Sequence, residues 1–119
     1  MLKVYEYAKC STCVKALKFL DSKKVGFKKI AIVDEPPSMK ELKEMLEALK
    51  AEGGSVRQMF NTSGLVYKEM KLSEKLPSLS EADALKLLAA NGKLVKRPFV
   101  IGSGHYLVGF KEDLWKKAF

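Results

Sequence analysis

Several residue types are rare in this chain of 119 residues, and each rarity excludes a class of site or of protein. It holds two cysteines, one histidine and one tryptophan. A closed structural zinc site normally needs four ligands, and beyond the cysteines only His105 remains as a soft ligand, so we expect no metal and no other bound cofactor. No apolar run approaches the roughly 18 residues of a membrane span, so we expect no membrane partner.

Arginine is scarce although the chain is basic. Lysine occurs twenty times and arginine only at Arg57 and Arg97, against 14 acidic residues, which gives a net charge of +8. A surplus of this size can attract nucleic acid. The lysines, however, are spread along the chain without a basic block, so we assign them to solvated helix faces and expect no direct nucleic-acid partner.

The remaining composition is that of a folded protein, with 47% hydrophobic and 30% charged residues. The N-terminal residues lack the apolar core of a signal peptide, so we expect a cytoplasmic location. Thiols stay reduced there, and a Cys-x-x-Cys pair is then more often catalytic or metal-binding than structural.

The apolar pattern predicts a single α/β domain over residues 1–119. Period-two alternation predicts strands, and apolar residues at helical spacing behind Ser caps predict helices. The expected elements, in order, are a strand at 2–7, a helix after the cysteines to Ser22, a strand at 27–33, a helix capped by Ser38 and Glu41, short helical pieces at 55–76, a helix capped by Ser80 and Asp83, strands at 99–102 and 105–109, and a final amphipathic segment. This order predicts a thioredoxin-like fold, a four-stranded mixed β-sheet flanked by helices with a helical insertion.

Both cysteines lie in YAKCSTCVKAL, where the first strand gives way to the first helix. Cys10 falls at the predicted N-cap, where orphan N–H groups and the helix dipole favour a thiolate, and Lys9 adds a neighbouring cation. Cys10 is therefore the predicted nucleophile, and Cys13, one turn along, is placed to resolve its adducts as a disulfide. Ser11 and Thr12 supply further donors suited to an oxyanion. Two unreactive buried thiols are the alternative.

Five separated motifs resemble one protein family. They are YAKCSTCVKALKFL, PPSMKEL, VRQMFNTSG, NGKLVKRPFVIG and LVGFKEDLW. Together they cover essentially the whole chain and resemble the glutaredoxin-linked arsenate reductase family and the related Spx-like regulators. The resemblance implies the thioredoxin-like fold, Cys10 as nucleophile, a small oxyanion substrate, glutathione as electron donor and a glutaredoxin or thioredoxin-type reductant as partner.

The resemblance also gives meaning to the two arginines. Arg57 in VRQMFN and Arg97 in KRP match oxyanion-binding arginines of the family, and a guanidinium grips a tetrahedral oxyanion through two parallel hydrogen bonds, as lysine cannot. Pro98 matches the family's cis-proline beside the active cysteine. The alternatives are that Arg57 is a solvated helix residue and Arg97 an ion-pair partner.

The sequence departs from the reductases at three places. A third oxyanion-binding arginine has no counterpart, since Gly109 and Phe110 stand in its region. The histidine that often precedes the nucleophile is absent, with Glu6 and Tyr7 there instead. Cys13 is extra relative to single-cysteine reductases, as it is in the regulators. Arsenate is therefore not fixed as the substrate.

Three functional hypotheses follow. The leading one is an arsenate-reductase-type thiol oxidoreductase with Cys10 as nucleophile and Cys13 resolving. The alternative is an Spx-like regulator that binds RNA polymerase near Gly53 or Gly54 and uses the cysteine pair as a redox switch; the chain's end at Phe119, without the regulators' tail, favours the first. A glutaredoxin-like disulfide reductase shares the chemistry but does not need the arginines.

Overall fold

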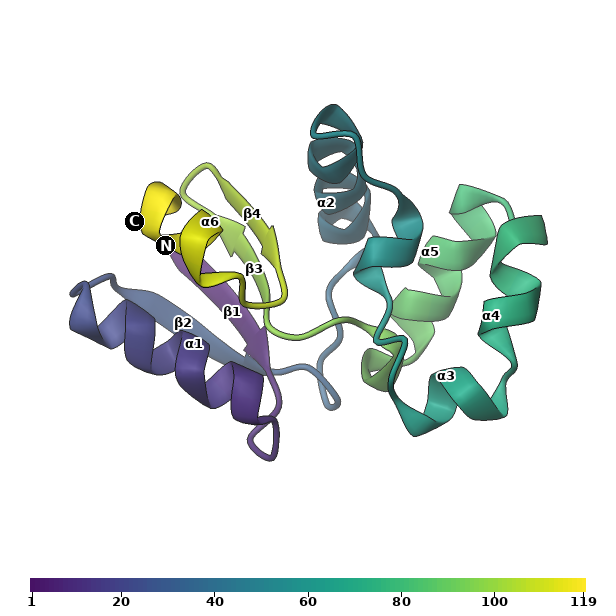
Figure 1. Ribbon diagram of the computed structural model, residues 1–119, viewed down its shortest axis with the longest axis horizontal. Coiled ribbons are helices and arrows are strands. Elements are labelled where there is room, and N and C mark those ends of the chain that lie inside the picture. The colour runs from purple at the N-terminus through teal and green to yellow at the C-terminus, as the bar shows by residue number, and fades with distance from the viewer.

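The computed structural model describes all 119 residues and contains one four-stranded sheet (Figure 1). Its strands are β1 (Leu2–Glu6), β2 (Phe27–Ala31), β3 (Phe99–Gly102) and β4 (His105–Val108), in the order β2-β1-β3-β4. The central strand β1 pairs parallel with β2 and antiparallel with β3, and β3 pairs antiparallel with β4. This is the mixed sheet that the sequence order predicted.

The chain also forms six α-helices and three short 3-10 helices. They are α1 (Ser11–Ser22), α2 (Met39–Ala51), η1 (Val56–Met59), α3 (Leu65–Glu69), α4 (Leu72–Lys75), η2 (Leu76–Ser78), α5 (Glu81–Ala90), η3 (Gly92–Leu94) and α6 (Glu112–Ala118). Helices α3, α4 and α5 gather to one side of the sheet and form the predicted helical insertion (Figure 1). None of these helices is both long and apolar enough to cross a membrane.

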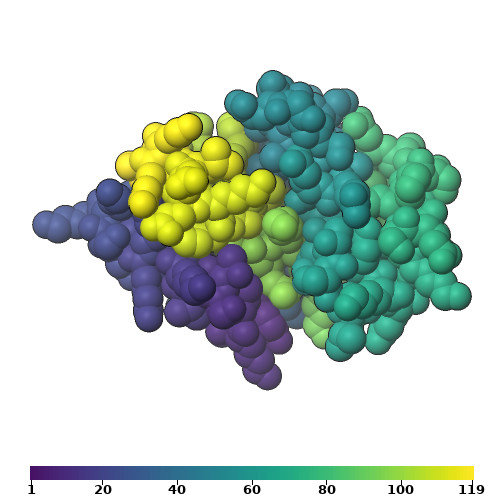
Figure 2. Space-filling model, viewed as in Figure 1, coloured from purple at the N-terminus to yellow at the C-terminus, as the bar shows by residue number.

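Two apolar clusters cover the two faces of the sheet. Because successive strand residues point to opposite faces, Leu2 and Val4 of β1 face α1 and α6, where Trp115 fills the smaller cluster. Tyr5 and Phe99 face the other way, into the larger cluster, which continues through α2 into α5. On the face shown in Figure 2, the C-terminal segment lies between the N-terminal residues and α2. The inserted helices therefore share a core with the sheet.

The predicted capping box starts α2 and also ties that helix to the sheet. The Ser38 hydroxyl accepts the N–H of Glu41 at 3.2 Å, and the Glu41 carboxylate accepts the N–H of Ser38 at 3.1 Å. The same carboxylate accepts the Tyr5 hydroxyl at 2.7 Å and pairs with Lys3 at 3.3 Å. Burial opposes ionisation of Glu41, but these partners hold its pKa below the usual range. One acidic side chain thus caps a helix and anchors it to β1.

The second strand ends earlier than the sequence predicts. Its ladder stops at Ala31, whose carbonyl accepts the N–H groups of Asp34 and Glu35 at 3.1 and 2.9 Å in a turn. Ile32 remains buried and donates its N–H to the Glu6 carbonyl at 2.9 Å. The apolar run IAIV therefore reflects burial that continues beyond the strand, with one more hydrogen bond to β1.

Gly92 lies close to this turn, and we expect a larger residue at this position to lower the stability of the fold. A Cβ on Gly92 would overlap the backbone carbonyl of Ile32, which cannot move away without disturbing the end of the sheet. We expect Gly92→Ala to lower the free energy of unfolding by about 1–3 kcal/mol. Gly26→Ala is the matched control, since a Cβ there meets nothing within 4 Å, and it should raise stability slightly or not change it. Urea unfolding midpoints of both variants test this; equal midpoints would contradict it.

Candidate active site

Cys10 is the N-cap residue of α1, as predicted. Its backbone is extended, with φ −93° and ψ 115°, and its Sγ accepts the N–H of Cys13 at 3.4 Å. Its own N–H donates to the Tyr7 carbonyl at 3.0 Å, which fixes the turn that leads from β1 into the helix. The reactive position is thus created where the chain leaves the sheet and the helix has free donors.

The two thiols lie in different surroundings. Both are free, but Cys13 is 0% exposed under α1, whereas Cys10 is only partly buried. Cys10 is therefore accessible from solvent, whereas Cys13 is enclosed.

The electrostatic environment separates the two pKa values. Partial burial alone would raise the pKa of Cys10, but hydrogen bonds from the Cys13 thiol and backbone N–H, with the charge of Arg97, outweigh it and lower the pKa below its ordinary value. Burial raises the pKa of Cys13 to about 12, and the neighbouring Cys10 adds to this. The outer thiol is therefore the more acidic of the two, and the inner one keeps its proton at neutral pH.

Arg97 supplies the cation beside Cys10. Its guanidinium carbon lies 4.8 Å from the centre of the Tyr7 ring, a cation–π contact that holds the side chain at the end of β1. The sequence assigned the neighbouring charge to Lys9, but that side chain is exposed in the turn before α1 and does not shift the pKa of Cys10. The Arg97–Pro98 peptide is cis, as expected, and Pro98 is buried behind Arg97.

A hollow of about 320 Å³ opens beside Cys10. Ten residues line it: Cys10, Thr12, Asn61, Ser63, Lys96, Arg97, Val108, Gly109, Phe110 and Lys111. Three of them are cations and none is a carboxylate. Of the two predicted hydroxyl donors, Thr12 reaches this hollow, while Ser11 is exposed and does not line it. The chain gathers no group of three or more His, Cys, Asp or Glu side chains that could hold a metal ion.

Lys96 is a site residue that sequence reasoning missed. Gly109, with φ +71°, stands where the third arginine is lacking, and a Cβ there would lie 2.8 Å from Cε of Lys96. The Lys96 stem therefore passes over Gly109 and occupies the space beside it. The Gly109 carbonyl accepts the indole N–H of Trp115 at 3.2 Å, which fixes this wall of the hollow. The only sequence signal for Lys96 was its place next to Arg97.

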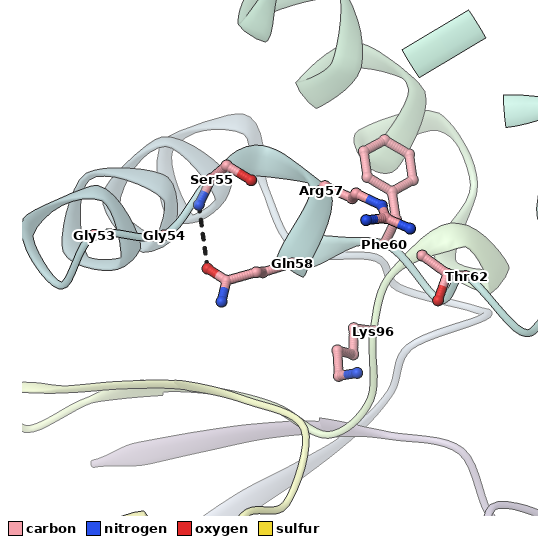
Figure 3. Close-up of a pocket in the computed structure, with 8 residues that line it drawn as sticks. All are labelled: Gly53, Gly54, Ser55, Arg57, Gln58, Phe60, Thr62 and Lys96. Atoms are coloured by element: carbon pink, nitrogen blue, oxygen red, sulfur yellow. Dashed lines mark hydrogen bonds between the residues drawn. The ribbon is translucent and has the colours of Figure 1, made fainter. Parts of the chain in front are cut away.

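Arg57 lies in a second, adjacent hollow rather than beside Cys10. This hollow of about 450 Å³ is shown in Figure 3, and eight residues line it: Gly53, Gly54, Ser55, Arg57, Gln58, Phe60, Thr62 and Lys96. Arg57 projects from η1 after the end of α2, so the structure does not bring the two arginines into one hollow. Lys96 alone lines both.

The environment of Cys10 predicts its reactivity with an alkylating agent. Because Arg97 lowers the pKa of Cys10, alkylation by iodoacetamide should reach half its maximal rate below the pH of about 8.5 typical of free cysteine, with Cys10 labelled before Cys13. Arg97→Ala should move the midpoint to higher pH. Lys9→Ala removes the same charge and should not. Mass spectrometry of the labelled peptides measures this, and first labelling of Cys13 would reverse the assigned roles.

Comparison with known proteins connects this site to a family. Residues 5–118 match the model of the ArsC family. Uncharacterized protein YusI of Bacillus subtilis (strain 168) is 42% identical over 116 residues, 98% of this chain and 96% of the relative. Global transcriptional regulator Spx of Enterococcus faecalis is 34% identical, over 95% of this chain and 82% of the relative. The solved structure of a possible arsenate reductase from Streptococcus mutans is 36% identical with a TM-score of 0.88, over 100% of this chain and 98% of that one.

These matches agree with the fold and extend over it. The solved structure aligns with the whole chain, so the sheet, its helices and the helical insertion form the thioredoxin-like arrangement of that family. The family model begins within β1, ends within α6 and includes both thiols and Arg97. The chain belongs to the ArsC family.

Proposed function

We propose that the chain is a cytoplasmic thiol oxidoreductase of the arsenate reductase type, in which Cys10 attacks the substrate and Cys13 resolves the adduct. The observation that carries this proposal is the contrast between the thiols. Cys10 is partly exposed with a lowered pKa, while Cys13 is enclosed behind it with a pKa raised to about 12. An accessible thiolate at Cys10 and a protonated thiol at the enclosed Cys13 suit a thiol–disulfide exchange in two steps.

The electrons balance in two steps. With a disulfide substrate, the Cys10 thiolate forms a bond to one sulfur and the substrate's S–S bond breaks, releasing one thiolate. Cys13 then gives up its proton and attacks the Cys10 sulfur, which releases the second thiolate and leaves a Cys10–Cys13 disulfide. The substrate gains two electrons and the pair loses two. A glutaredoxin or thioredoxin-type dithiol, or two molecules of glutathione, returns them.

With arsenate the same thiols act on a different atom. The Cys10 sulfur bonds to arsenic as water leaves, and attack by Cys13 on that sulfur releases arsenic as arsenite, reduced by two electrons. The Arg97 guanidinium in the hollow has the fork that pairs with two oxygens of a tetrahedral oxyanion. Thr12 and the first N–H groups of α1 add donors on the same side.

A second candidate is a redox-sensing regulator that binds RNA polymerase, with the same cysteine pair as its switch. The likeness to the Spx relative supports it. Gly53 is exposed after α2, in the region where the resemblance puts a polymerase contact. Arsenate turnover with glutathione and glutaredoxin, set beside a pull-down with RNA polymerase, separates the two functions, because a switch would bind polymerase without turnover.

Mild oxidation should join the two cysteines within one chain. Cys10 Sγ already contacts the first turn that carries Cys13, so a short loop closes without moving the sheet. One equivalent of peroxide should therefore yield an intramolecular disulfide, detected by peptide mapping under non-reducing conditions. Cys13→Ser should give sulfenic acid or intermolecular dimers instead. If the wild type also gives only dimers or over-oxidised Cys10, Cys13 does not resolve.

The substitution Arg97→Lys should separate the effect of the positive charge of Arg97 from that of its planar guanidinium group. Lysine keeps the positive charge near Cys10 but loses the fork, so arsenate or sulfate binding should weaken roughly tenfold while Cys10 keeps most of its reactivity with a neutral alkylating agent. Calorimetric titration and alkylation rates measure the two effects. Lys86→Ala, which removes a charge from an exposed site on α5, should alter neither. Unchanged oxyanion binding in Arg97→Lys would count against the reductase and favour the regulator.

A further inference from the structure

Tyr7 and Arg97 continue the register of the sheet beyond its last paired residues. The antiparallel ladder ends where Tyr5 of β1 pairs with Phe99 of β3. Two residues further along, the same register sets Tyr7 level with Arg97. Tyr7 does not pair there, since its carbonyl accepts the N–H of Cys10 at 3.0 Å. Its ring still meets the guanidinium, whose carbon lies 4.8 Å from the ring centre, so the cation–π contact is a cross-strand pair made by side chains alone.

The Tyr7 ring has a fixed position of its own. It is partly buried and packs against the larger apolar cluster of the sheet. Tyr5 and Phe99, which precede it on the same face, are in edge-to-face contact with ring centres 5.7 Å apart. A ring held by core packing offers its face to a cation at little cost in conformational entropy.

The Arg97 guanidinium, by contrast, has no acidic partner. It takes part in none of the chain's ion pairs, and no carboxylate lines the hollow that it shares with Cys10. A long side chain without such a partner retains several rotamers, and each rotamer places the charge differently. The contact with the Tyr7 ring therefore restricts the guanidinium where an ion pair would otherwise do so.

The position of this charge matters for Cys10. Partial burial alone would raise the pKa of Cys10, but hydrogen bonds from Cys13 and the charge of Arg97 outweigh it and hold the pKa below its ordinary value. The other cations of the hollow are Lys96 and Lys111, and neither lowers the pKa of Cys10. Because a charge that moves out into water is screened, an unrestrained Arg97 would stabilise the thiolate less.

We propose that Tyr7 is a positioning residue whose ring holds the Arg97 guanidinium at the Cys10 site, where it faces both the thiolate and a bound oxyanion. This role rests on the proposed function, in which Arg97 acts, and names the residue that sets the geometry of that arginine. In the sequence, Tyr7 stood out only because it lies, with Glu6, where the histidine of the reductases is absent. Its side chain acts on an arginine rather than on the substrate.

The substitution Tyr7→Leu removes the aromatic ring but keeps an apolar side chain on the cluster. Without the ring, the rate of Cys10 alkylation by iodoacetamide at pH 7 should fall about threefold, the size of a cation–π contact at a half-exposed site. The pH midpoint of the reaction should move upward, as in Arg97→Ala but less far. Tyr7→Phe keeps the ring and should behave as the wild type. Tyr106→Leu, the matched control, removes an exposed ring from β4 and should change neither quantity.

The double variant Tyr7→Leu/Arg97→Ala separates positioning from a general loosening of the fold. If Tyr7 acts through Arg97, this variant should have the rate and the midpoint of Arg97→Ala alone. Sulfate binding, measured by calorimetric titration, should weaken about threefold in Tyr7→Leu and stay unchanged in Tyr7→Phe. A wild-type pH profile in Tyr7→Leu, or a further fall in the double variant, would overturn the positioning role and leave the thiol exchange intact. If Arg97→Ala itself leaves Cys10 unchanged, the part of Arg97 in the proposed function fails, and the role of Tyr7 fails with it.

Discussion

The geometry around Cys10 depends on the pairing of β1 with two neighbouring strands. Tyr5 stands opposite Ile30 on one side and Phe99 on the other, and the ladder to β3 stops at that level. The chain leaving β1 and the chain entering β3 therefore meet at one edge of the sheet. The Tyr7 ring and the Arg97 guanidinium come into contact there, beside the start of α1. The antiparallel pairing of β1 with β3 thus brings Arg97, which is far from Cys10 in the sequence, close to the Cys10 thiol.

The first turn of α1 then places the two thiols in different environments. Cys10 stands just outside the helix, where its sulfur accepts a free N–H. Cys13 lies inside it, and the packing of α1 on the sheet excludes water from its side chain. Because of this three-residue spacing, the Cys10 thiol is accessible and its charge is stabilised, whereas the Cys13 thiol is enclosed. Packing that keeps α1 on the sheet, through residues such as Leu20, therefore also maintains the difference in acidity.

Much of this architecture was predictable because its causes are local. The N-cap role of Cys10 and the box at Ser38 follow from residues within one helical turn, and the strand–helix–strand order follows from apolar spacing. The position of Arg97 came from resemblance, since only strand pairing brings it to Cys10. The features that were not predicted are long-range: Lys96 fills the space beside Gly109, which follows β4, and an isolated bridge between Phe60 and Val95 joins the segment after Arg57 to the segment before Arg97.

The hydrogen bond from Trp115 to Gly109 has an optical consequence. Trp115 is the only tryptophan in the chain, it is 1% exposed, and its indole is bonded to a residue that lines the Cys10 hollow. It also packs edge-on against Phe19 of α1, with ring centres 6.1 Å apart. The molecule therefore carries a single tryptophan packed between the helix that bears the thiols and the residues that face them, so emission excited selectively from this indole can follow ligand binding and thiol oxidation without an attached dye.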